Sequence, residues 1–265
     1  MNVPASLFPH ASESLHWYYP DGKPAYEVPS SDGTKMVNPD IRHARKLSLL
    51  PSVTTVMRVL AAPGLERWKR EQFALSALTL TRSPNEPDEH FLRRVDEDSR
   101  AWALKRADEG TRLHKAIEQA FRGEDYDRAF ADHVELVKKK LDQLPLAFVA
   151  DFKTKDTLDG KLERALFYDE HVMQLAAYAK ALDHVDRADL TFEQCVVGEG
   201  YAGRCDVHRR GCSVAPLVSI MIGVRPAAVA VKIWEPAEAE RGWSMFEHAL
   251  KLWQLKNRYA PKAMP

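Results

Sequence analysis

Residues 146–153 read Leu-Ala-Phe-Val-Ala-Asp-Phe-Lys, a short apolar run that ends in charged side chains. A run of this length and composition is typical of a buried β-strand. Side chains alternate along a strand, so Asp151 and Lys153 share one face and Phe152 points the other way, into the core. An unpaired charge at the end of such a strand is costly to desolvate. This pair is therefore the first candidate for a functional site.

The segments around this strand predict a small sheet packed between helices. Apolar residues recur at helical spacing before it, and the helices that we expect there cover residues 52–60, 65–80, 90–122 and 127–144. Ser52 or Thr54 would cap the first helix, and Gly110-Thr111 would interrupt the third. After the strand we expect a helix over 170–182, strands within 191–210 and over 218–224 and 228–234, and a closing helix over 238–259.

This order of elements predicts an α/β or α+β fold, a small mixed sheet flanked by helices with a helical N-terminal portion. We expect residues 1–50 to form an N-terminal hairpin and extended cover, with Asp21-Gly22 in a turn within residues 16–28. Residues 51–265 would form a single domain. Its helical part would cover 51–145, its sheet core 146–235, and its closing helix 238–259.

The composition excludes several classes of protein. Lys+Arg and Asp+Glu both total 38, and this balance counts against a protein that simply coats nucleic acid, although a nuclease can combine acidic ligands with a local basic groove. Three cysteines without a CxxC pair argue against a disulfide framework, a zinc ribbon and an iron–sulfur cluster. No signal peptide or membrane span is recognisable, so we expect a cytoplasmic protein.

A divalent metal would explain a carboxylate and a lysine in apolar surroundings. Magnesium prefers oxygen ligands and keeps several waters, one of which can act as the nucleophile in hydrolysis. Lys153 could orient that water or hold developing negative charge. The alternative for Asp151 and Lys153 is a plain ion pair, because an acid two residues before a lysine is frequent by chance.

Other parts of the chain carry side chains that suit the same site. Gln174 and Tyr178 are four residues apart on the expected helix, so they share a face and could contact a phosphodiester. His114 follows Gly110 on another helix, with Glu118 one turn beyond. Residues 200–206, Gly-Tyr-Ala-Gly-Arg-Cys-Asp, would place Asp206 in a hairpin.

Together these motifs resemble the RecB-type branch of the PD-(D/E)XK nuclease superfamily, and residues 50–54 are similar to phage-encoded exonucleases of that branch. The resemblance implies a restriction-endonuclease-like core and a Mg²⁺ or Mn²⁺ cofactor. It assigns metal binding to His114, Asp206, Asp151 and the backbone carbonyl of Phe152, with Glu118 as an additional candidate. It makes Asp151, Lys153 and Asp206 the catalytic residues and assigns DNA contacts to Gln174, Tyr178 and Arg204.

The order of the motifs departs from the family, in which the G-x-x-D hairpin precedes the D-x-K strand. Here Asp206 follows both that strand and the Gln174–Tyr178 helix. Because an active site needs geometry and not sequence order, we favour an exchange of segments that preserves the arrangement in space. An earlier acid could instead complete the site, the candidates being Asp125, Asp127, Asp132 and Asp142. Alternatively, Asp206 is structural and the site is incomplete.

The sequence therefore predicts a metal-dependent DNA nuclease, an exonuclease in preference to an endonuclease. The alternative is a non-catalytic DNA-binding or recombination-accessory protein that keeps the fold with an incomplete site. The expected partner is linear DNA, and a homo-oligomer or a recombination partner protein fits the family, which includes phage enzymes of the host cytoplasm. We interpret the scattered histidines, namely His171, His184, His208 and His248, as surface or structural residues.

Overall fold

The computed structural model describes residues 16–30, 32–60, 63–144, 148–155, 167–183 and 215–261. At its centre lies a three-stranded sheet with the strand order β5 (Val149–Lys155), β6 (Leu217–Gly223), β7 (Ala228–Trp234). β5 and β6 are parallel, and β6 and β7 are antiparallel. The fold is therefore mixed α/β with a small mixed sheet, as expected, and these strands lie within three residues of their predicted bounds.

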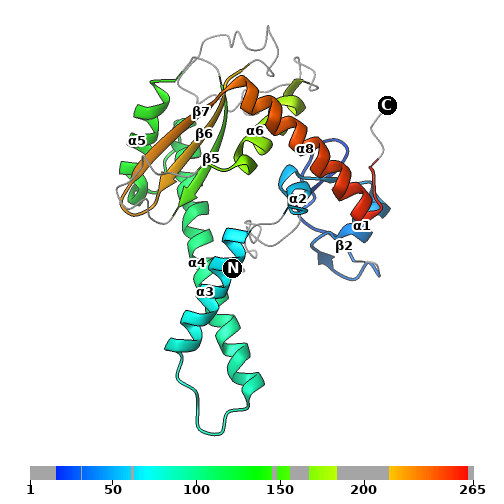
Figure 1. The fold of residues 1–265 in the computed structure, drawn as a ribbon, viewed down its shortest axis with the longest axis vertical. Coiled ribbons are helices and arrows are strands. Elements are labelled where there is room, and N and C mark those ends of the chain that lie inside the picture. The colour runs from blue at the N-terminus through cyan, green and yellow to red at the C-terminus, as the bar shows by residue number, and fades with distance from the viewer. Residues whose placement is uncertain are drawn as a thin grey trace.

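Helices cover both faces of the sheet (Figure 1). One face packs against α4 (Asp88–Phe121) and α5 (Ala131–Leu141), and the other against α6 (Asp169–Asp183) and α8 (Pro236–Asn257). β6 is buried along its whole length and divides its side chains between them: Ile220 and Ile222 pack towards α4 and α5, and Leu217 towards α6. A short 3₁₀ helix (Arg128–Phe130) precedes α5.

The expected break in the helix over 90–122 is wrong, because α4 continues through Gly110 without interruption. Gly110 is buried against β5, where an added Cβ would lie only 2.7 Å from Thr154 Oγ1. Thr111 stays helical and donates a hydrogen bond from its hydroxyl to the Ala107 carbonyl, at 2.9 Å. The glycine therefore permits close contact between helix and strand, and does not end the helix.

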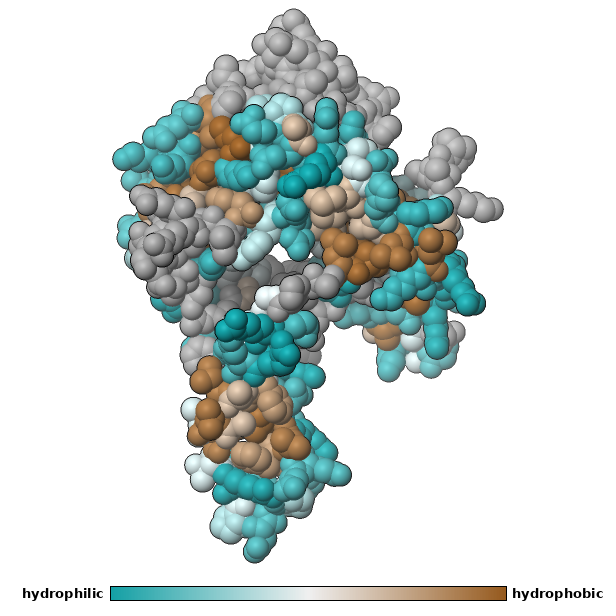
Figure 2. Space-filling model, in the orientation of Figure 1, coloured by the Kyte–Doolittle hydropathy of each residue, from teal (hydrophilic) through white to brown (hydrophobic). Residues whose placement is uncertain are grey.

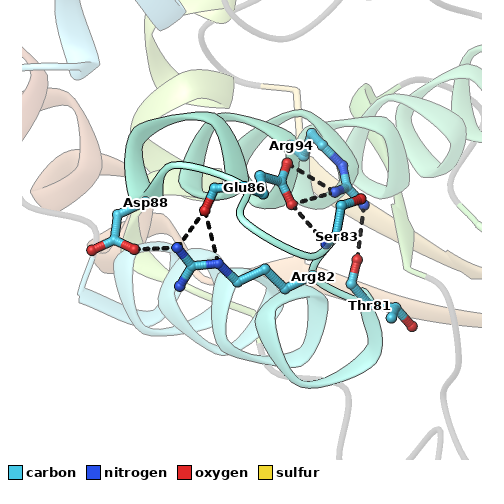
Figure 3. Close-up of polar contacts among 6 residues, drawn as sticks. All are labelled: Thr81, Arg82, Ser83, Glu86, Asp88 and Arg94. Carbon is cyan, nitrogen blue, oxygen red and sulfur yellow. Dashed lines mark hydrogen bonds and ion pairs between the residues drawn. The ribbon is translucent and has the colours of Figure 1, made fainter.

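The first half of α4 pairs with α3 (Pro63–Thr79) in a helical arm that projects from the sheet (Figure 1). Around the tip of this arm, Arg94 forms an ion pair with Glu86 at 2.8 Å, and Arg82 binds the Glu86 carbonyl and the Asp88 carboxylate (Figure 3). Large apolar side chains are exposed on the arm (Figure 2), namely Leu65, Trp68, Phe73, Leu75, Leu78, Leu92 and Leu104.

The N-terminal portion packs on the far end of α8. β1 (Trp17–Tyr18) pairs with β4 (Leu50–Pro51), and β2 (Val28–Pro29) with β3 (Met36–Val37). The predicted turn at Asp21-Gly22 is present, with Gly22 at a φ of 83°. The buried Trp17 ring lies against Trp253 of α8, with their centroids 6.0 Å apart. Residues 17–49 thus contribute to a second apolar cluster, which they share with α6 and α8.

Two short helices complete this portion. α2 (Val53–Met57) begins after Ser52, whose hydroxyl accepts a hydrogen bond from the Thr55 amide at 3.1 Å, as the sequence predicted. α1 (Ile41–Leu47) was not predicted, and Asp40 caps it. Within the described part of the chain, no helix combines the length and the apolar character needed to cross a membrane.

Candidate functional site

Asp151 and Lys153 lie on the face of β5 that looks towards α6. Lys153 Nζ is 2.9 Å from Asp151 Oδ2, and the Asp151 side chain is only 12% exposed. Phe152, between them, packs into the core on the opposite side with α4 and α5. Because the lysine lies beside the acid on the same strand face, the charge of the buried carboxylate is compensated locally.

Gln174 of α6 connects these two charged groups. Lys153 Nζ donates a hydrogen bond to Gln174 Oε1 at 2.8 Å, and Gln174 Nε2 lies 3.5 Å from Asp151 Oδ1. An ammonium group can only donate, so the carbonyl end of the amide must face the lysine. The buried amide therefore fixes the lysine and the carboxylate relative to each other.

Tyr178 extends this chain of contacts along α6. Gln174 Nε2 donates to Tyr178 Oη at 2.6 Å, which leaves the phenolic hydrogen available to a further acceptor. Burial raises the pKa of Tyr178, and the negative charge of Asp151 raises it further, so the phenol stays protonated at neutral pH. Tyr18 of the N-terminal hairpin also contributes to this rise, so that hairpin borders the site.

One oxygen of the carboxylate has no hydrogen bond. Asp151 Oδ2 is buried and has no hydrogen-bond partner among the described residues, where its contact is the ion pair with Lys153 at 2.9 Å. Buried polar atoms in native proteins are nearly always satisfied. A carboxylate oxygen in this state suits a hard cation such as Mg²⁺, which prefers oxygen ligands.

The described residues contain no group of three His, Cys, Asp or Glu side chains placed to hold a metal ion. Asp206 and Arg204, which the sequence assigned to the site, lie outside the described residues. The predicted hairpin that carries them, within 191–210, lies outside these residues as well. Asp151, Phe152, His114 and Glu118 are the metal-ligand candidates within the described residues, and the roles of Asp206 and the Phe152 carbonyl stay predictions.

The two candidates on α4 differ in their surroundings. His114 is partly buried, and its pKa is lowered by desolvation and then by the positive charge of Lys153, so the ring is neutral near pH 7 and close to the site. A neutral imidazole is the form that binds metals. Glu118 is exposed and forms an ion pair with Arg122 at 2.8 Å on the same helix.

Two of the four alternative acids before the strand have local structural contacts. Asp127 caps the 3₁₀ helix before α5 and forms an ion pair with Arg112 at 2.6 Å, which lowers its pKa. Asp125 forms an ion pair with Arg128 at 3.1 Å. These contacts give both carboxylates roles that need no metal.

His171, which was interpreted from the sequence as a surface or structural residue, belongs to the same region. Its pKa is lowered by burial and by the charge of Lys153, whereas the charge of Asp151 acts in the opposite direction. His171 precedes Gln174 by three residues and Tyr178 by seven, so all three lie on one face of α6. That spacing was readable in the sequence, but the burial of the ring was not.

The described site thus joins a strand from the middle of the chain to the helix that follows it. Its charged and polar groups converge on one side of the sheet, where Gln174 links the Asp151–Lys153 pair to the Tyr178 phenol. Neither a scan against protein-family models nor a search of curated proteins found a match to this chain.

Proposed function

We propose that this chain is a metal-dependent nuclease that hydrolyses phosphodiester bonds in DNA. The observation that carries the proposal is the buried Asp151–Lys153–Gln174 cluster, in which one carboxylate oxygen lacks a hydrogen bond. Such a cluster offers one oxygen to a cation and one ammonium group to an anion. A phosphodiester with its metal ion presents this combination of charges.

A plain ion pair is a less satisfactory explanation of these contacts. Lys232 and Glu238 illustrate such a pair, at 2.8 Å, in which Glu238 also accepts a hydrogen bond from the Glu235 amide and helps to cap α8. Asp151 differs from Glu238 in that it caps no helix, and among the described residues its buried Oδ2 contacts the Lys153 ammonium without a hydrogen-bond partner. Keeping a carboxylate in this state reduces stability, so a functional reason for its presence is favoured.

The proposed roles follow from what each group can donate or accept. Asp151 would hold Mg²⁺ or Mn²⁺, which when bound supplies an activated water and stabilises charge on the phosphate. Lys153 would hold developing negative charge on a phosphate oxygen, because its ammonium group carries donors beyond those that contact Asp151 and Gln174. Tyr178 would donate its free hydroxyl hydrogen to the DNA backbone, while Gln174 would orient Lys153.

Further parts of the proposal rest on the resemblance to RecB-type PD-(D/E)XK enzymes. These are DNA as the substrate, attack from a free end, and the participation of His114 and Asp206 in metal binding. The balanced net charge is compatible with this, because a local cluster and not the total charge steers the substrate.

The test compares Lys153→Ala and Asp151→Asn with wild type on end-labelled linear DNA, with Mg²⁺ or Mn²⁺ and with a chelator. We expect wild type to degrade the DNA only with metal, and each variant to lose on the order of 10²–10³-fold in rate. Lys232→Ala is a matched control, since Lys153 and Lys232 are both strand lysines with 31% exposure in an ion pair, and it should keep activity.

Two results would overturn the proposal. If wild type leaves both linear and circular DNA intact with either metal, the chain is not a nuclease. If wild type binds DNA without cutting it, the non-catalytic accessory role is supported instead. Circular DNA that is cut as fast as linear DNA would contradict attack from an end only.

A further inference from the structure

His171 is placed on the same face of α6 as the two residues that contact the site. The spacing of His171, Gln174 and Tyr178 is three and four residues, which brings side chains into one row along a helix. The row runs beside β5, where Gln174 contacts Lys153. The side of α6 that faces the site therefore includes His171, one turn before Gln174.

Aromatic side chains hold the imidazole in place. The His171 ring makes edge contacts with Phe167 and Tyr168, at centroid distances of 6.3 and 5.8 Å and interplanar angles of 83° and 78°. A ring packed in this way has little freedom to turn, which reduces the entropy lost when it binds a ligand.

One ring nitrogen has no hydrogen bond. His171 Nδ1 is buried and finds no hydrogen-bond partner among the described residues, as is also true of Asp151 Oδ2. Unsatisfied buried atoms are rare, and two of them occur here around one lysine. A shared ligand that accepts a hydrogen bond from the ring and brings a cation to the carboxylate would satisfy both.

We propose that His171 is a further substrate-contacting residue, which donates its Nδ1 hydrogen to a non-bridging oxygen of the phosphate held beside Lys153. The inference rests on the proposed nuclease function and deepens it. Gln174, one turn further along the same face of α6, accepts a hydrogen bond from Lys153, so a phosphate bound by that ammonium group would lie beside this face of the helix. The neutral ring still supplies one donor, which is sufficient for one phosphate oxygen.

Isosteric substitutions of His171 test the proposal. The side-chain nitrogen of asparagine can take the place of Nδ1, whereas that of glutamine reaches the place of Nε2. We therefore expect His171→Ala and His171→Gln to lower kcat/KM on DNA by about 10- to 100-fold, the range for a lost hydrogen bond to a charged group. His171→Asn should recover most of that loss.

Controls separate this role from structural and metal-binding roles. His133 of α5 also has a buried Nδ1 without a partner among the described residues, but its Nε2 lies 3.0 Å from the Val224 carbonyl, away from the site. His133→Asn and His133→Gln should have equal kcat/KM values, and the His171 variants should melt within a few degrees of wild type. The Mg²⁺ concentration for half-maximal rate should be the same in wild type and His171→Ala.

Three outcomes would overturn the inference. If wild type is active and His171→Ala has the same kcat/KM, the role of His171 is overturned and the proposed function stays intact. A Mg²⁺ midpoint raised tenfold in His171→Ala would make the ring a metal ligand and not a phosphate donor. An inactive wild type overturns both this inference and the proposed function.

Discussion

The contact between Gly110 and Thr154 makes a prediction that does not depend on function. Replacing Gly110 by alanine in the middle of a helix gains about 1 kcal/mol in helix propensity. However, the new Cβ would lie 2.7 Å from Thr154 Oγ1, and overpacking of this kind typically costs about 1–3 kcal/mol. In the wild-type background we therefore expect Gly110→Ala to leave stability unchanged or to lower it by up to about 2 kcal/mol.

The same substitution should have the opposite effect once Thr154 is shortened. In a Thr154→Ala background the hydroxyl is gone, and Gly110→Ala should stabilise the protein by about 1 kcal/mol. Urea unfolding of all four proteins, followed by tryptophan fluorescence, gives the coupling free energy between the two positions, which we expect to be about 1–3 kcal/mol. A coupling below about 0.5 kcal/mol would refute the close approach of α4 to β5.

Three further predictions concern the helices around the site. Gly242→Ala should destabilise the protein by about 1–2 kcal/mol in urea unfolding, because its Cβ would lie 2.9 Å from the backbone oxygen of Val172, whereas Gly64→Ala, in open space, should not destabilise it. Ser52→Ala should cost about 1 kcal/mol by the same measurement through loss of the α2 cap, and Ser52→Asp should recover most of it. Burial lowers the pKa of His114 below 6.5 in the folded state, so the unfolded chain binds more protons and the free energy of unfolding falls as the pH drops below about 6.5. His114→Gln should weaken this dependence of stability on pH between pH 7 and pH 5. An unchanged slope in the variant would contradict the prediction.

The central sheet and α6 could be predicted because the pattern of apolar residues in each segment is typical of a single kind of secondary structure. β5, β6 and β7 are apolar runs, and α6 has apolar residues at helical spacing. Asp151 and Lys153 share a strand face by simple alternation, so their pairing was also accessible. These features depend only on residues close to one another in the chain.

Other features depend on contacts that no local pattern encodes. Gly110 was interpreted as a helix break because its neighbour Thr154 is remote in sequence. α1 is only seven residues long and mostly polar, so its apolar period is too short to detect, and its cap depends on Asp40 and His43. His171 was interpreted as a surface or structural residue, because the burial of its ring and the nearby charges of Lys153 and Asp151 arise only in the folded chain. Each of these features could be recognised only from the way in which the folded chain places its residues in space.

The uninterrupted course of α4 has a consequence for how the chain can change in length. At 1.5 Å per residue, the 34 residues of this helix form a rod on the order of 50 Å long. Gly110 sets the rotational phase of that rod against β5, and His114 follows four residues later. One residue inserted between them would turn His114 by about 100° around the helix axis, whereas insertions at the arm tip would leave its phase unchanged.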